Sequence, residues 1–351
     1  MRGSIRLFKV FGISINIHVT FLLILALFFW GGLKSAVLII GVFTLVTLHE
    51  LCHSLVAKRF GVQVTDITLL PIGGVASMAR MPEKPLQEFL IALAGPLFNL
   101  AVIVALYLPM QAIFGRGFLR YPLSIETWPL TAVYIYKINF FLAVFNLIPA
   151  FPMDGGRLLR SVLAQKLGFY RATKIAVSLG HLFALVFAFF GIVVRFNILW
   201  IAIAFFIYIA ASSEEAQVDI KETLKKVRVR DILSRDFLKL TSDMTLKKVL
   251  ETMFHSRQED FPVVDGGRMT GFVTRQDIMN SIHQFGMEKS VSDIMRKDFP
   301  ALSETDKLGA VQELMHDKGM TALPVMKDGQ VIGIVTFEDI GRAYTILARR
   351  F

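Results

Sequence analysis

The sequence is poor in cysteine and in charged residues. It has one cysteine among 351 residues (Cys52), which excludes an internal disulfide and a zinc site built from several thiolates. Charged residues make up 19% of the chain and hydrophobic residues 54%, whereas soluble globular domains are about a quarter charged. Such high hydrophobicity also excludes a disordered chain. This composition is typical of a protein that crosses a membrane several times.

Apolar stretches of about 20 residues are long enough to span a bilayer. Six occur in the first part of the chain, at residues 15–32, 35–57, 87–109, 129–148, 172–191 and 196–212. The first follows basic residues but lacks a small-x-small cleavage site, so we interpret it as an uncleaved span. Residues 214–351 have the composition of a soluble domain. We therefore expect a polytopic α-helical membrane protein of six spans, followed by a soluble module.

The net charge of +10 could indicate a nucleic-acid partner, but its distribution indicates topology instead. Residues 1–213 hold 17 Lys+Arg and 6 Asp+Glu, whereas residues 214–351 hold 21 and 22. The soluble half therefore lacks the basic surface that nucleic acid would require, and we expect no such partner. With the N-terminus inside, the inside loops hold 12 basic residues and the outside loops 4. The positive-inside rule then predicts a multi-pass cell-membrane protein whose N-terminus and soluble module are cytosolic.

The second predicted span contains His49-Glu50-Leu51-Cys52-His53. Positions i and i+4 share one face of a helix, so His49 and His53 can hold one metal ion together. Glu50 can accept a proton from water at such a metal, as a general base. A chance match is the alternative explanation. Ionisable residues inside a span are costly and tend to be functional, which favours the metal site.

A catalytic zinc site needs a third protein ligand. Asp154 is the only acidic residue in the segment 146–156, which follows the fourth span. The second and fourth spans leave the membrane on the same side, so Asp154 and His53 should lie at similar depth. The alternative is that Asp154 merely caps the next helix.

These two motifs together resemble those of the site-2 protease family of intramembrane zinc metalloproteases. The likeness is greatest to the six-span group with a C-terminal CBS pair, and it covers essentially the whole chain. The resemblance implies one zinc ion, held by His49, His53 and Asp154, with Glu50 as the general base.

The resemblance also implies residues that bind substrate. Asn146 and Pro149 are expected to engage the substrate backbone. Asn99, the last residue of a Gly-Pro-x-x-Asn element at 95–99, is expected to lie with them near the active site.

The segment 62–76 is rich in β-branched residues and is predicted to form a strand or hairpin. A helical substrate must unwind before its peptide bond can be cut, and unpaired backbone groups in a membrane cost several kcal/mol each. We hypothesise that this segment pairs with the unwound substrate by β-addition. An ordinary interfacial hairpin is the alternative.

The soluble half contains an internal repeat with a constant offset of 62 residues. The repeats resemble tandem CBS domains, which form one α/β Bateman module. That resemblance implies that Thr274 and Thr336 contact the phosphates of an adenine nucleotide and that Asp277 and Asp339 contact its ribose. The alternative is that the threonines only N-cap their helices and the module only dimerises.

We therefore expect a membrane metalloprotease domain (1–213), a connecting helix (214–228), CBS 1 (229–284) and CBS 2 (285–351). The resemblance implies an endopeptidase that cuts a membrane-anchored protein near the cytosolic face, in regulated intramembrane proteolysis. Nucleotide at the CBS pair would modulate it. The cytosolic CBS modules would form a homodimer, and the lipid bilayer would surround the membrane domain. Two alternatives stay open: a CBS-regulated metal or ion transporter, and an inactive protease homologue acting as a membrane chaperone.

Overall fold

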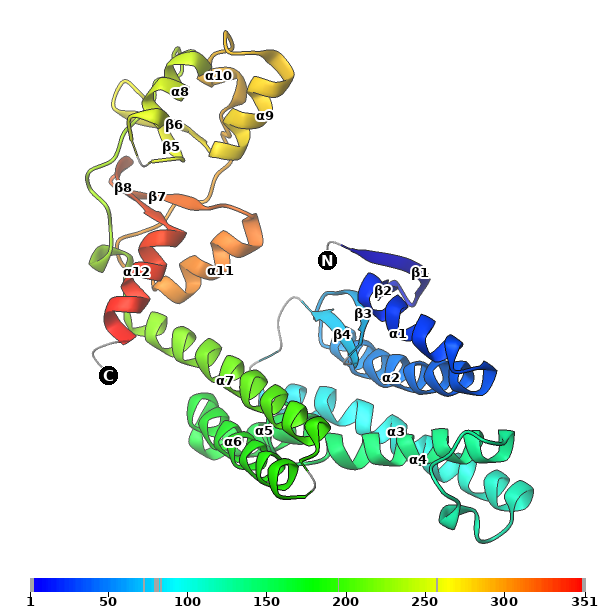
Figure 1. Cartoon of the computed structure of the whole chain (residues 1–351). Coiled ribbons are helices and arrows are strands. Elements are labelled where there is room, and N and C mark those ends of the chain that lie inside the picture. Colours follow the sequence, from blue (N-terminus) through cyan, green and yellow to red (C-terminus); the bar gives the residue numbers. More distant parts are fainter. Residues whose placement is uncertain are drawn as a thin grey trace. The chain divides into compact units, whose positions relative to one another are not determined.

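The computed structural model describes residues 3–71, 73–78, 82, 84–194, 196–256 and 258–348. The chain divides into two compact units, Met1–Ala216 and Gln217–Phe351. Helices dominate the first unit, and the second combines short hairpins with helices (Figure 1). The fold is thus an α-helical membrane unit followed by an α/β unit, as the composition predicted.

Within the described residues, five helices are long and apolar enough to cross a membrane. They are α2 (Leu33–Arg59), α3 (Pro85–Phe114), α4 (Trp128–Asn146), α6 (Phe169–Val193) and α7 (Ile198–Lys226). Large apolar side chains stay exposed on their outer faces, for example Leu108 and Leu185, each 69% exposed. Exposure of this kind is favourable when the surrounding solvent is lipid. These helices confirm the predicted membrane unit.

The first predicted span, residues 15–32, is only partly helical, and a count of six spans is not confirmed. Helix α1 (Val19–Trp30) has 12 residues, about 18 Å at 1.5 Å per residue, whereas the hydrocarbon core is about 30 Å thick. The residues before it form strand β2 (Ile13–His18). In this strand isoleucine alternates with serine, asparagine and histidine, the pattern of a half-buried strand. The apolar run therefore contains two elements.

A four-stranded sheet packs beside α2, with strand order β1-β2-β3-β4. Its other members are β1 (Ser4–Val10), β3 (Val64–Leu70) and β4 (Gly73–Met78). Strands β2 and β3 are parallel, with Ile15 opposite Ile67, and both isoleucines are buried. Because β2 precedes α1 and β3 follows α2, this pairing places the N-terminal strands at the same end of the α1–α2 pair as the end of α2. Strands β3 and β4 form the predicted hairpin, and β4 is an edge strand.

Two short elements complete the membrane unit: η1 (Phe118–Arg120) and α5 (Asp154–Leu167). Helix α5 follows a short loop after α4 and packs against α3 and α6. Residue 195 in the predicted outside loop and residue 80 in the predicted inside loop lie outside the described residues.

The second unit contains one arrangement twice: a helix, an antiparallel hairpin and another helix. Its elements are η2 (Val229–Asp231), α8 (Leu246–Phe254), β5 (Phe261–Asp265), β6 (Arg268–Val273), α9 (Arg275–Phe285), α10 (Val291–Ile294), α11 (Leu308–Lys318), β7 (Ala322–Lys327), β8 (Gln330–Thr336) and α12 (Phe337–Ala348).

The segment at the start of each repeat pairs with the hairpin of the other repeat. Ser234 bridges Ile334 of the second hairpin, while Arg296 bridges Phe272 of the first. Each packed half therefore takes residues from both predicted CBS ranges.

Candidate metal centre

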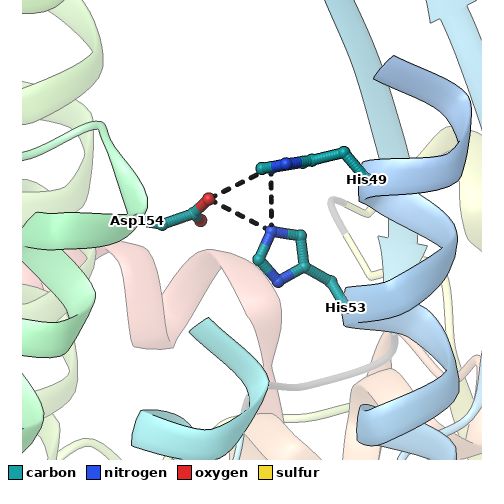
Figure 2. Close-up of side chains that lie close together, drawn as sticks. All are labelled: His49, His53 and Asp154. Carbon is teal, nitrogen blue, oxygen red and sulfur yellow. Dashed lines mark hydrogen bonds and ion pairs between the residues drawn. The ribbon is translucent and has the colours of Figure 1, made fainter. Parts of the chain in front are cut away.

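Three side chains from two distant helices converge in the membrane unit. His49 and His53 lie one turn apart on α2, and Asp154 is the first residue of α5; Figure 2 shows the three pointing toward one another. Nε2 of His53 lies 3.1 Å from both Nε2 of His49 and Oδ2 of Asp154. Nε2 of His49 lies 3.2 Å from the same Oδ2. Both histidines are buried, at 3% and 6% exposure.

This triangle of donor atoms fits a zinc ion. Zinc binds histidine nitrogen and carboxylate oxygen at about 2.0–2.1 Å, so two ligands of a tetrahedral site are about 3.3 Å apart. The observed separations of 3.1–3.2 Å are close to that value. Nδ1 of His53 donates to the carbonyl oxygen of Ile91 at 2.6 Å. That hydrogen bond selects the tautomer in which Nε2 keeps its lone pair for a metal.

Helix α3 leaves room for the two imidazole rings at Gly95. A Cβ atom at this position would lie 2.2 Å from Nε2 of His53 and 2.6 Å from Nε2 of His49. Any side chain here would occupy the space of the donor atoms. The sequence placed Gly95 only within the Gly-Pro-x-x-Asn element, and its contact with the histidines depends on how α2 and α3 pack.

A cavity of about 570 Å³ opens on the three side chains. Glu50 and Asn146 line it, together with residues 73–76 of β4. The backbone of Gly74 lies against Glu50, because a Cβ atom on this glycine would be 2.9 Å from Cγ of the glutamate. Arg157, which was not predicted to belong to the site, also lines the cavity one turn after Asp154. The structure thus brings the expected base and one expected substrate residue to the candidate metal centre.

The other two predicted substrate residues lie elsewhere. Among the described residues, neither Pro149 nor Asn99 lines this cavity. Pro149 is exposed, and Asn99 is fully buried between α3 and α4, where its carbonyl oxygen accepts a hydrogen bond from Asn139 at 3.0 Å. Their proposed substrate roles gain no support from this geometry.

Asp154 does not act as the cap of α5. The N-cap residue is Met153, and no side chain of the described residues caps the helix. The carboxylate of Asp154 is instead directed at the two histidines, which favours the ligand interpretation over the capping one.

The predicted nucleotide residues form two capping boxes. The hydroxyl groups of Thr274 and Thr336 donate to Asp277 and Asp339, and each aspartate N–H donates back to its threonine. The N-cap function considered as the alternative is therefore present in both repeats.

The two boxes differ in one partner. Arg296 donates to both carboxylate oxygens of Asp277, at 2.8 and 2.9 Å. Partial burial acts to raise the pKa of Asp277, but the hydrogen bonds from Arg296 and Thr274 outweigh it and hold the pKa below its ordinary value. Within the described residues, Asp339 has no arginine partner. The two repeats are therefore not equivalent at these positions.

The model of Peptidase family M50 matches residues 37–124 and 122–187, and the CBS domain model matches residues 229–284 and 291–345. A zinc metalloprotease of Methanocaldococcus jannaschii is 36% identical over 353 residues, which cover 99% of this chain and 98% of the relative. The chain belongs to peptidase family M50. The Rip3 protein of Mycobacterium tuberculosis is a further relative, 30% identical over 97% of this chain and 93% of its own.

A solved structure of a site-2 protease from Methanocaldococcus jannaschii is 41% identical to this M50 chain. It covers 60% of this chain and 95% of its own, with a TM-score of 0.46. The family and its named relatives identify the chain as a zinc metallopeptidase of family M50 with a C-terminal CBS pair.

Proposed function

We propose that this M50 peptidase is an intramembrane endopeptidase that cuts a membrane-anchored protein near the cytosolic face. The observation that carries the proposal is the buried convergence of His49, His53 and Asp154 on a cavity that also contains Glu50. These three residues would hold one zinc ion, which when bound supplies Lewis-acid activation of water and of a peptide carbonyl.

The chain's own residues have separable tasks in this reaction. Glu50 would take a proton from the attacking water and then pass it to the leaving amine nitrogen. Asn146 lines the same cavity and carries an amide that can donate to, or accept from, the substrate backbone.

Strand β4 is suited to hold an unwound substrate. It is the edge of the sheet, it lines the cavity, and its Gly74 lies against Glu50. An extended substrate segment that pairs with this edge would satisfy its freed backbone groups and run directly past the base.

The proposed topology places the N-terminus and the CBS pair in the cytosol. The excess of basic residues in the inside loops supports it, as does the parallel pairing of β2 with β3, which joins the N-terminal strands to the segment after α2. We retain the division into 1–213, 214–228, 229–284 and 285–351, with homodimer formation through the CBS pair.

An adenine nucleotide at the CBS pair would modulate cleavage. Thr336 lies where strand β8 leads into α12, and helix N-termini bind phosphate. The Asp339 carboxylate is hydrogen-bonded to Thr336 and has no arginine on it among the described residues. We propose that this half of the pair is the one that takes the nucleotide.

The test is to separate zinc binding from cleavage in the full-length protein in detergent. Glu50→Gln should keep one zinc per chain and slow cleavage of a single-span peptide at least 100-fold, about the least that a lost general base costs. His49→Ala and Asp154→Ala should lose both zinc and cleavage. Glu126→Gln, on the loop before α4, is the control that should keep both. Cleavage at the wild-type rate by Glu50→Gln would falsify the proposal.

A further inference from the structure

Arg160 is a buried arginine on α5, six residues after Asp154, with 2% of its surface exposed. Its Nε donates to Oε1 of Glu88 on α3 at 2.8 Å, and its Nη1 donates to Oε1 of Glu214 on α7 at 2.6 Å. Replacing a buried ion pair with well-packed apolar residues is often neutral or stabilising. Stability alone therefore does not explain why three membrane-unit helices are joined through one guanidinium group.

The same guanidinium group also holds the loop that carries Asp154. Its carbon lies 4.7 Å from the ring centre of Phe151, which precedes Asp154 by three residues. Phe151 is 2% exposed and packs with Ala176 of α6 and Ala211 of α7. Its backbone N–H donates to the carbonyl oxygen of Ala176 at 3.2 Å. The loop is thus fixed on three sides immediately before the candidate metal ligand.

Helix α7 contacts both parts of this arrangement with one face. Ala211 and Glu214 are three positions apart, a spacing that places both on the same side of a helix. Ala211 belongs to the same buried cluster as Phe151, and Glu214 pairs with Arg160. The same helix continues to Lys226, and its Leu224, fully buried, belongs to the core of the second unit with Val311 and Leu323.

We propose that Arg160 is a positioning residue, which fixes Asp154 relative to α7 through its contacts with Phe151 and Glu214. The inference rests on the proposed function, because it takes Asp154 as a metal ligand.

The experiment uses cobalt in place of zinc in the full-length protein, because the visible spectrum of Co²⁺ reports the arrangement of its ligands. Glu214→Gln and Arg160→Lys should bind one Co²⁺ per chain with an altered spectrum. In competition with a chelator they should bind it about tenfold more weakly, the lower end of the loss seen for outer partners of metal ligands. Glu215→Gln is the matched control. It neighbours Glu214 on α7 and pairs with Lys174 at 2.8 Å, each side chain about one-third exposed.

The outcomes separate this inference from the proposed function. If Glu214→Gln keeps its helix content and shows the wild-type spectrum and affinity, the positioning role is wrong even though the metal centre stands. If Asp154→Ala shows the wild-type spectrum, or if the wild-type protein takes up no Co²⁺, the metal centre itself fails and the inference falls with it. Glu214→Gln is the decisive variant because its side chain is 26% exposed, so it disturbs packing less than a change at Arg160.

Discussion

Gly95 of α3 packs so closely against His53 of α2 that a Cβ atom on the glycine would lie 2.2 Å from Nε2 of the histidine. Gly95→Ala should therefore abolish stoichiometric zinc binding. Alanine is the better helix former by about 1 kcal/mol, so a loss of metal would come from the clash and not from helix propensity. Metal analysis of the purified protein tests this.

The control for this variant is Gly117→Ala. Gly117 follows α3, has φ −91° and has no atom within 4 Å of a built Cβ, so its zinc content should equal that of the wild type. A full complement of zinc in Gly95→Ala would show that α2 and α3 pack differently from the arrangement described above.

Proline substitutions in β4 should impair cleavage without removing zinc. Proline has no N–H to donate, so at the positions whose N–H faces away from β3 it would remove one hydrogen bond to a paired substrate. Scanning residues 74–76 should lower kcat/KM at those positions. Leu7→Pro in β1, the opposite edge of the sheet, is the control and should leave cleavage unchanged. Undiminished cleavage across the scan would leave β4 as an ordinary interfacial hairpin.

The two CBS repeats should respond differently to substitution. Asp339→Ala is expected to weaken the binding of ATP, ADP or AMP at least tenfold, since it removes a carboxylate that has no arginine partner among the described residues and could accept from the ribose. Asp277→Ala should weaken it much less, because Arg296 already occupies that carboxylate. Isothermal titration of the full-length protein measures both. An equal loss of nucleotide affinity in the two variants would contradict the proposal. So would the absence of binding heat with any of the three nucleotides.

Acid should weaken the second unit through Asp277. Its pKa lies below the ordinary value of 3.8, because hydrogen bonds from Arg296 and Thr274 outweigh partial burial. A depressed pKa means that the stabilisation is complete above about pH 4 and is lost as the pH falls through the folded-state pKa. Hydrogen exchange can follow this at the backbone bridge between Phe272 and Arg296, whose N–H groups donate across it at 3.0 and 2.9 Å.

In Asp277→Asn the protection of these two amides, corrected for intrinsic exchange, should no longer depend on pH in this range. Asp339→Asn, at the matching position of the second repeat, should behave like the wild type. If amide protection changes with pH in the same way in the wild type and in Asp277→Asn, the ion pair between Asp277 and Arg296 does not stabilise the bridge.

The convergence of His49, His53 and Asp154 could be predicted because its signals are local. The two histidines are one helical turn apart, and the parity of the spans brings Asp154 to the same side of the membrane. The contact of Gly95 with the histidines could not be predicted. It depends on how α2 packs against α3, and in the sequence strands β3 and β4 lie between these two helices.

The strand β2 was missed although its signal was in the sequence. Isoleucine alternates with polar residues at 13–18, but the predicted apolar span of 15–32 overlaps this segment and hides the strand pattern. In the sequence, Arg160 is only one of the 12 basic residues in the predicted inside loops. Its partners, Glu88 and Glu214, are 72 and 54 residues away, and no local pattern identifies charges that pair over such distances.

The parallel pairing of β2 with β3 also constrains how the chain is made. Strand β2 leaves the ribosome first, but its partner emerges about fifty residues later, after α1 and α2. Non-local strand pairing of this kind is slow, because the loop between the strands must close first. The β3–β4 hairpin can form by itself, but the complete four-stranded sheet cannot form until α1, α2 and β3 have all been made.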